Sequence, residues 1–169
     1  MKTALRTALA AIALIATTVV GIDAQTNSAS IQATATVQQP INVTGAADLV
    51  FGNVFPGVNK TVAVTAGGAG RWNVAGQAAA PVQLTFGLPA TLSDGGSNTL
   101  PIATYTGHWN NTAASPSGGT NFTPAAAPTS STLGAAGQLY IYIGATVNPA
   151  TNQAAGTYSG SLSMTVVYF

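Results

Sequence analysis

The sequence contains no cysteine among its 169 residues, and this absence excludes several kinds of chemistry at once. Without thiols the chain cannot form a disulfide, and it cannot use cysteine as a nucleophile or as a metal ligand. The fold must therefore be held by an apolar core or by contacts with neighbouring molecules. Hydrophobic residues make up 47% of the chain, which is enough to build such a core and argues against disorder.

Charge is nearly as scarce, because only 4% of the residues are charged, against about 25% in average proteins. From residue 25 onward, Lys60 and Arg71 balance Asp48 and Asp94, so the formal charge of this part is zero. No basic patch remains that could bind nucleic acid or anionic lipid. Since a surface with so little charge does not hold molecules apart, we expect a protein that associates with itself.

Groups that could carry catalysis are also few. His108 is the only histidine, and Asp48 and Asp94 lie far apart in the sequence, each beside turn-forming residues. No zinc-ligand spacing, phosphate-binding loop or nucleophile elbow is present. We therefore expect no enzyme activity, no metal and no cofactor. His108 and Trp109 are candidates for surface contacts with a ligand such as a sugar, but an exposed loop histidine and a core tryptophan explain them as well.

Residues 1–24 are typical of a secretory signal peptide. Lys2 and Arg6 form a short basic region, an apolar run follows over residues 8–20, and a cleavage site is predicted after Ala24. This run is shorter than the roughly 20 residues of a membrane-spanning helix, although a retained amphipathic anchor is an alternative. We expect a secreted protein with no membrane span after cleavage.

Residues 25–37 are predicted to form an N-terminal extension with a regular alternation. Its apolar side chains share one parity: Ile31, Ala33, Ala35 and Val37. Pro40 cannot donate a ladder hydrogen bond, so it divides or ends any strand here. Two interpretations remain open. The extension is a donor strand whose four apolar residues fill a neighbouring subunit, or Ile31 to Val43 is the first strand of the chain's own sheet.

Residues 38–169 are predicted to form one all-β domain. About seven or eight short strands, separated by turns rich in Gly, Pro and Asn, favour an antiparallel β-sandwich. In one of them Leu139, Ile141 and Ile143 share one face, while Tyr140 and Tyr142 share the other. Residues 110–137 lack any periodicity and are predicted to be a long surface loop.

The final strand is predicted over Gly156 to Phe169. Its apolar face alternates with a face of hydroxyl-bearing residues, which is the pattern of a half-buried strand. The residues that define the apolar face and its start are Gly156, Tyr158, Leu162, Met164, Val166 and Tyr168. Neither this strand nor the alternating N-terminal stretch carries a charge that would guard its edge.

Several short motifs, taken in order, resemble a known family. They are Asp48 to Gly52 (DLVFG), Pro56-Gly57, Gly70-Arg71, Gly156 to Gly160 (GTYSG) and a closing Val-Val-Tyr168. The pattern resembles bacterial secreted domains of unknown function, of the DUF4402-like kind, which are related to spore coat protein U and to chaperone–usher fimbrial subunits. Pilins also carry a penultimate tyrosine and a glycine fourteen residues from the end, where this chain has Tyr168 and Gly156.

The resemblance implies an incomplete, immunoglobulin-like sandwich that a strand from the next subunit completes by donor-strand exchange. It implies a structural subunit of an extracellular filament, pilus or coat on a bacterium, whose partner is a further copy of itself. A periplasmic chaperone and an outer-membrane usher are the implied assembly partners. The alternative is a secreted monomeric carbohydrate-binding or adhesin-like module that uses His108, Trp109 and the 110–137 loop.

Overall fold

A computed structural model describes residues 27–169 of the chain, and the predicted signal peptide lies outside them. The residues from Val37 onward form one compact unit. Residues 27–41 belong to no strand, and Ile31 and Val37 are 96% and 94% exposed. The interpretation of Ile31 to Val43 as the chain's own first strand is therefore wrong, except for its last two residues. The alternating apolar side chains stay outside the sheets of their own chain.

The described part of the chain is all-β, as the sequence predicted. It contains ten strands: β1 Asn42–Ala47, β2 Lys60–Val62, β3 Gly70–Ala75, β4 Pro81–Gly87, β5 Thr91–Ser93, β6 Thr99–Asn110, β7 Thr120–Phe122, β8 Thr129–Thr132, β9 Gln138–Val147 and β10 Ser163–Tyr168. Every strand pair is antiparallel. No helix long and apolar enough to cross a membrane occurs among residues 27–169.

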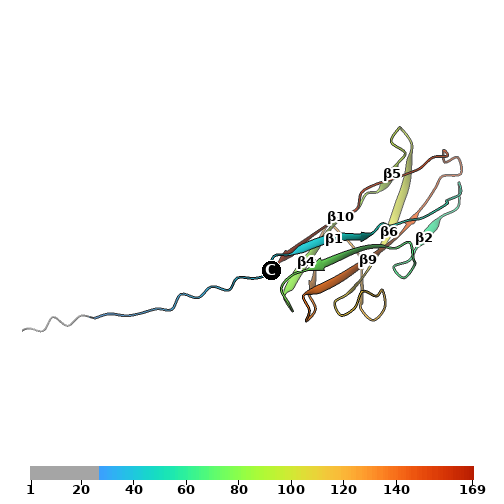
Figure 1. Ribbon diagram of the computed structural model, residues 1–169. Coiled ribbons are helices and arrows are strands. Elements are labelled where there is room, and N and C mark those ends of the chain that lie inside the picture. Colours follow the sequence, from blue (N-terminus) through green and yellow to red (C-terminus); the bar gives the residue numbers. More distant parts are fainter. Residues whose placement is uncertain (1–26) are drawn as a thin grey trace, which may run out of the picture. The chain divides into compact units, whose positions relative to one another are not determined.

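The strands form two sheets, an arrangement consistent with a β-sandwich (Figure 1). The larger sheet follows the order β1-β3-β9-β6-β5, with β2 added beside β9 and β7 added beside β6. The smaller sheet follows the order β10-β4-β8. β9 is the centre of the larger sheet, since it pairs with β3 and β2 along one edge and with β6 along the other.

The main core lies where β4 meets β3 and β9. Alternate residues of these strands are fully or almost fully buried: Val74, Val82, Leu84, Phe86, Leu139, Ile141 and Ile143. The burial of Leu139, Ile141 and Ile143 confirms that they share one face of their strand. Leu133 completes this cluster. A second cluster at the far end of β6 and β9 contains Leu92, Leu100, Ile102, Ala145 and Val147.

A bulge in β6 changes which side chains of that strand face the core. The pairing with β9 shifts between Ala103 and Thr106, and Thr104 has a φ of 51°. A β-branched residue rarely adopts this left-handed conformation, so the bulge is a strained feature that the surrounding structure maintains. Tyr105 packs against both clusters, and its hydroxyl donates to the Pro89 carbonyl at 2.6 Å. Burial raises the pKa of Tyr105.

The interval predicted as one long loop, residues 110–137, contains the strands β7 and β8. Phe122 on β7 packs against Phe86 with ring centroids 5.5 Å apart, and its ring lies over Gly107, where a side chain would collide with it. The turn after β6 is ordered by the buried side chain of Asn110. Its Oδ1 accepts three hydrogen bonds from residues 112 and 113, and its Nδ2 donates to the carbonyls of Ser115 and Ser117.

Candidate functional site

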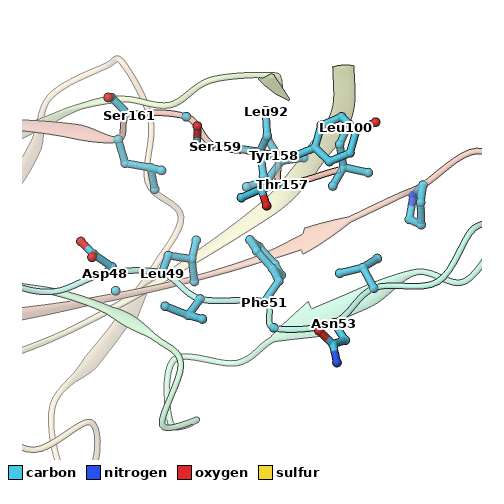
Figure 2. A pocket seen from close by; sticks show the side chains of 18 of the residues that line it. Asp48, Leu49, Phe51, Asn53, Leu92, Leu100, Thr157, Tyr158, Ser159 and Ser161 are labelled. Carbon is cyan, nitrogen blue, oxygen red and sulfur yellow. The ribbon is translucent and has the colours of Figure 1, made fainter. Parts of the chain in front are cut away.

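An open groove of about 1050 Å³ lies in the described part of the chain. One wall is the segment from Gly45 to Pro56, and the opposite wall is the segment from Gln153 to Leu162. Figure 2 shows these two walls facing each other, with Phe51 reaching into the space below Leu92, Leu100 and Thr157. The floor includes core residues of β6 and β9, so the groove reaches the apolar core.

From Asp48 to Pro56 the first wall belongs to no strand. Leu49, Phe51 and Val54 are partly buried against the second core cluster. Val50 and Phe55 are 56% and 69% exposed, so this wall also presents an apolar rim to solvent. The backbone turns away from a sheet here because glycines with positive φ at positions 52 and 57 interrupt it.

The opposite wall contains the first half of the predicted final strand. β10 begins only at Ser163, so Gly156, Tyr158 and Leu162 precede it and line the groove, whereas Met164, Val166 and Tyr168 lie in β10. This wall is fixed by two reciprocal backbone hydrogen bonds of 2.8 Å between Ser93 and Ser159. The Tyr158 hydroxyl accepts from Gln153 and donates to the Ala154 carbonyl, each at 2.8 Å.

The groove lies beside strands that end their sheets. β1 ends the larger sheet next to β3, and β10 ends the smaller sheet next to β4. Among residues 27–169, no strand pairs with the outer edge of either one. Neither β1 nor β10 contains a charged residue. The chain therefore presents two uncharged edges whose backbone groups can accept a further strand.

The penultimate tyrosine fixes the point where the N-terminal extension enters the domain. The Tyr168 hydroxyl donates to the carbonyl of Gln39 and accepts from the backbone N–H of Gln77, both at 2.7 Å. Gly76 leaves room for this hydroxyl, because a side chain at that position would collide with it. The chain is thus tied to the end of β10 at Gln39, just after the extension ends at Val37.

His108 and Trp109, the predicted surface contacts, lie in β6 rather than in a loop. His108 is only 5% exposed, and its Nδ1 lies 2.8 Å from Oδ1 of Asn121, so its expected exposure is wrong. Trp109 packs against the main core cluster. The β6 bulge explains the difference, because it turns Trp109 toward the core and His108 toward the outer face of the sheet. The structure does not bring these two side chains to one surface site.

The two carboxylates have different surroundings. Asp94 closes a turn, since its carboxylate accepts hydrogen bonds from the Asn98 side chain at 2.7 Å and from the Gly96 N–H at 2.8 Å. These bonds hold the pKa of Asp94 below its ordinary value. Asp48 is exposed at the mouth of the groove. Within residues 27–169, no three His, Asp or Glu side chains cluster as a metal site would require.

The sequence pattern did not identify the segment from Leu49 to Val54 as a groove wall. Its signal was a short apolar run ending in glycine, which is also what a buried strand would show.

The family model described as a domain of unknown function (DUF4402) matches residues 41–168. No curated protein matches the chain.

Proposed function

The chain belongs to the DUF4402 family of domains of unknown function, and from this premise we propose that it is the structural subunit of a bacterial extracellular filament, pilus or coat. The subunits polymerise non-covalently by donor-strand exchange. The domain is a pilin-like, immunoglobulin-like sandwich, and the donor is the segment 25–37 of the next copy. The single observation that carries this proposal is an open groove with an apolar floor in a chain that also has an exposed, alternating, unpaired segment.

The donor and the groove have matching chemistry. Ile31, Ala33, Ala35 and Val37 project from one face of an extended chain, and their total spacing is about 20 Å at roughly 3.3 Å per residue. The groove has an apolar floor, and the domain offers the uncharged edges of β1 and β10 for a backbone ladder. Strand addition of this kind takes affinity from main-chain hydrogen bonds and specificity from pockets for alternate side chains.

The extension cannot satisfy its apolar side chains within its own domain as described. Ile31 and Val37 are almost completely exposed, and burying either one would contribute roughly 1.5–3 kcal/mol. A neighbouring groove supplies that burial. Because the donor leaves the domain at Gln39, beside β10, each contact is head-to-tail, and a repeated contact that does not close produces a filament.

The composition supports the same assembly. Lys60, Arg71, Asp48 and Asp94 are the only charged residues of the part that follows residue 24, so repulsion between copies is weak. In this proposal a signal peptide directs secretion of the chain. A periplasmic chaperone and an outer-membrane usher then assist its assembly. No observation on the described residues favours the carbohydrate-binding alternative at His108 and Trp109, because both side chains are taken up by the fold.

A pair of substitutions in the full chain from Gln25 onward tests the proposal by electron microscopy. Ile31→Asp places a carboxylate on the face that enters the groove, and Gln32→Asp places the same carboxylate on the opposite face. Since an unpaired charge is strongly disfavoured in an apolar site, we expect filaments from the parent chain and from Gln32→Asp but not from Ile31→Asp.

Removal of residues 25–37 gives the second comparison. We expect the shortened chain to remain folded by circular dichroism and to be monomeric in solution. Filaments formed equally well by the shortened chain would show that another segment makes the contact between subunits. A parent chain that stays monomeric under all conditions would overturn the proposed function.

A further inference from the structure

One row of side chains crosses the outer face of the larger sheet. The registers pair Ala47 with Arg71, Arg71 with Tyr142, Tyr142 with His108, and His108 with Asn121, across β1, β3, β9, β6 and β7. Directly opposed residues of antiparallel strands project to the same face. The core residues Trp72, Ile141 and Trp109 occupy the next positions and project to the other face. A cation, a phenol and an imidazole thus lie side by side, away from the core.

A pocket of about 300 Å³ opens on this row. Its side walls are the loop at residues 64–67 and two residues of the turn after β6, Ala114 and Pro116. Ala47, Ala69, Arg71 and Tyr142 line the rest of it. The pocket is a separate cavity from the groove of the proposed function, although Ala47 and Arg71 line both.

Two polar groups that line the pocket are buried without a partner in the described part of the chain. Tyr142 is only 6% exposed, and its hydroxyl makes no hydrogen bond. The Nε of Arg71 is also buried and makes no hydrogen bond within the described residues. Buried polar atoms are paired in the great majority of cases, so two unpaired donors at one small pocket indicate a site that a ligand completes.

The charge of the pocket selects the ligand. No acidic side chain is among the residues that line it, so the single guanidinium faces no counter-charge there. A guanidinium presents a planar fork of donors that fits a carboxylate, and one positive charge balances one carboxylate but not a doubly charged phosphate. A volume near 300 Å³ is at the lower end of ligand pockets and suits a molecule of about monosaccharide size.

We propose that this pocket binds a small monocarboxylate, up to the size of a sugar acid. Arg71 pairs with the carboxylate, and the Tyr142 hydroxyl donates a further hydrogen bond to it. Val64, Ala66 and Pro116 provide apolar contacts for the body of the ligand. His108 does not line the pocket. Its ring lies next to that of Tyr142, with the two ring centroids 6.4 Å apart. The argument for this ligand does not rest on the proposed assembly.

Calorimetric titration of the full chain from Gln25 with sodium glucuronate, methyl glucuronate and glucose tests the proposal. We expect glucuronate to bind at least about tenfold more tightly than its uncharged ester or glucose, because only the acid pairs with Arg71. This comparison needs no variant. Equal affinities for the acid and the ester, or no heat with glucuronate, would overturn the proposal.

Variants identify the residues. Arg71→Gln and Tyr142→Phe are expected to weaken glucuronate binding, the first by about tenfold or more and the second by several-fold. Tyr140→Phe is the matched control, because Tyr140 lies on the same strand and face but does not line the pocket, so its affinity should equal that of the parent. Circular dichroism verifies that each variant is folded. Unchanged binding in folded Arg71→Gln would place the ligand elsewhere.

Discussion

Removing the hydroxyl of Tyr168 should weaken both the domain and the anchor of its N-terminal extension. In Tyr168→Phe, the Gln77 N–H and the Gln39 carbonyl each lose a hydrogen bond of 2.7 Å. A typical protein hydrogen bond contributes about 0.5–1.5 kcal/mol to stability, so two bonds predict a loss of about 1–3 kcal/mol. The ring itself is retained, and its packing against the main core is unchanged. The loss therefore measures the hydroxyl alone.

Urea denaturation followed by tryptophan fluorescence measures this loss, because Trp72 and Trp109 are both partly buried against the core. Tyr140→Phe serves as the control and should change the free energy of unfolding by less than about 0.5 kcal/mol. Hydrogen exchange gives a local readout, since the Gln77 amide should exchange faster in Tyr168→Phe. A loss below about 0.5 kcal/mol together with unchanged exchange at Gln77 would refute the anchoring role of the hydroxyl.

Three further predictions concern the core, a turn and a carboxylate. Leu84 is fully buried, so Leu84→Ala should lower the free energy of unfolding by about 2–5 kcal/mol in urea denaturation. Gly137 has a φ of 72°, and a side chain there would collide with the backbone oxygen of Gly76, so Gly137→Ala should destabilise the domain by more than the roughly 1–2 kcal/mol of the backbone conformation alone. The folded state lowers the pKa of Asp94, so its contribution to stability is present above the ordinary aspartate pKa and is lost as pH falls through the lowered value. The difference in stability between the parent and Asp94→Ala should therefore shrink in acid.

Each of these predictions has an outcome that contradicts it. A loss below about 1 kcal/mol for Leu84→Ala would mean that the two sheets do not enclose this side chain. Gly95→Ala is the control for Gly137→Ala, since Gly95 also has a positive φ but open space around it, and equal losses would show that the predicted collision is absent. A stability difference that is the same in acid and near neutral pH would exclude the proposed hydrogen-bond effect on Asp94.

The central strands could be predicted because their local pattern and their tertiary environment agree. β4 and β9 alternate in sequence, and the apolar residues on one face of each strand are those that the core buries. Their strong apolar periodicity leaves one face that must be covered, which fixes both the element and its orientation.

β7 and the outer-face row could not be predicted from local sequence. Thr120-Asn-Phe122 has no strand periodicity, and it becomes a strand because Phe122 finds space over Gly107 and a partner in Phe86. Arg71, Tyr142 and His108 come from three distant segments that only the sheet order places in one row. Tertiary packing decides these features.

The alternation at residues 31–37 shows a different limit of sequence reasoning. A period-2 pattern specifies that one face must be covered but does not specify which molecule covers it. In the described structure these residues belong to no sheet of their own chain. Likewise, the β6 bulge reverses the facing of His108 and Trp109, and a positive φ at Thr104 gives no signal in the sequence.

The hydrogen bond between Tyr168 and Gln39 joins positions separated by almost the whole length of the domain. The first and last residues of the domain are therefore close together in space, and they can be joined without disturbing the sheets. A circularly permuted chain should reach the same fold when a short glycine-rich linker joins the end of β10 to Gln39 and new ends open among the exposed residues 126–128. In such a permutant the segment 25–37 can be attached to one of the new ends. The fold of the domain is then independent of the position at which the extension begins.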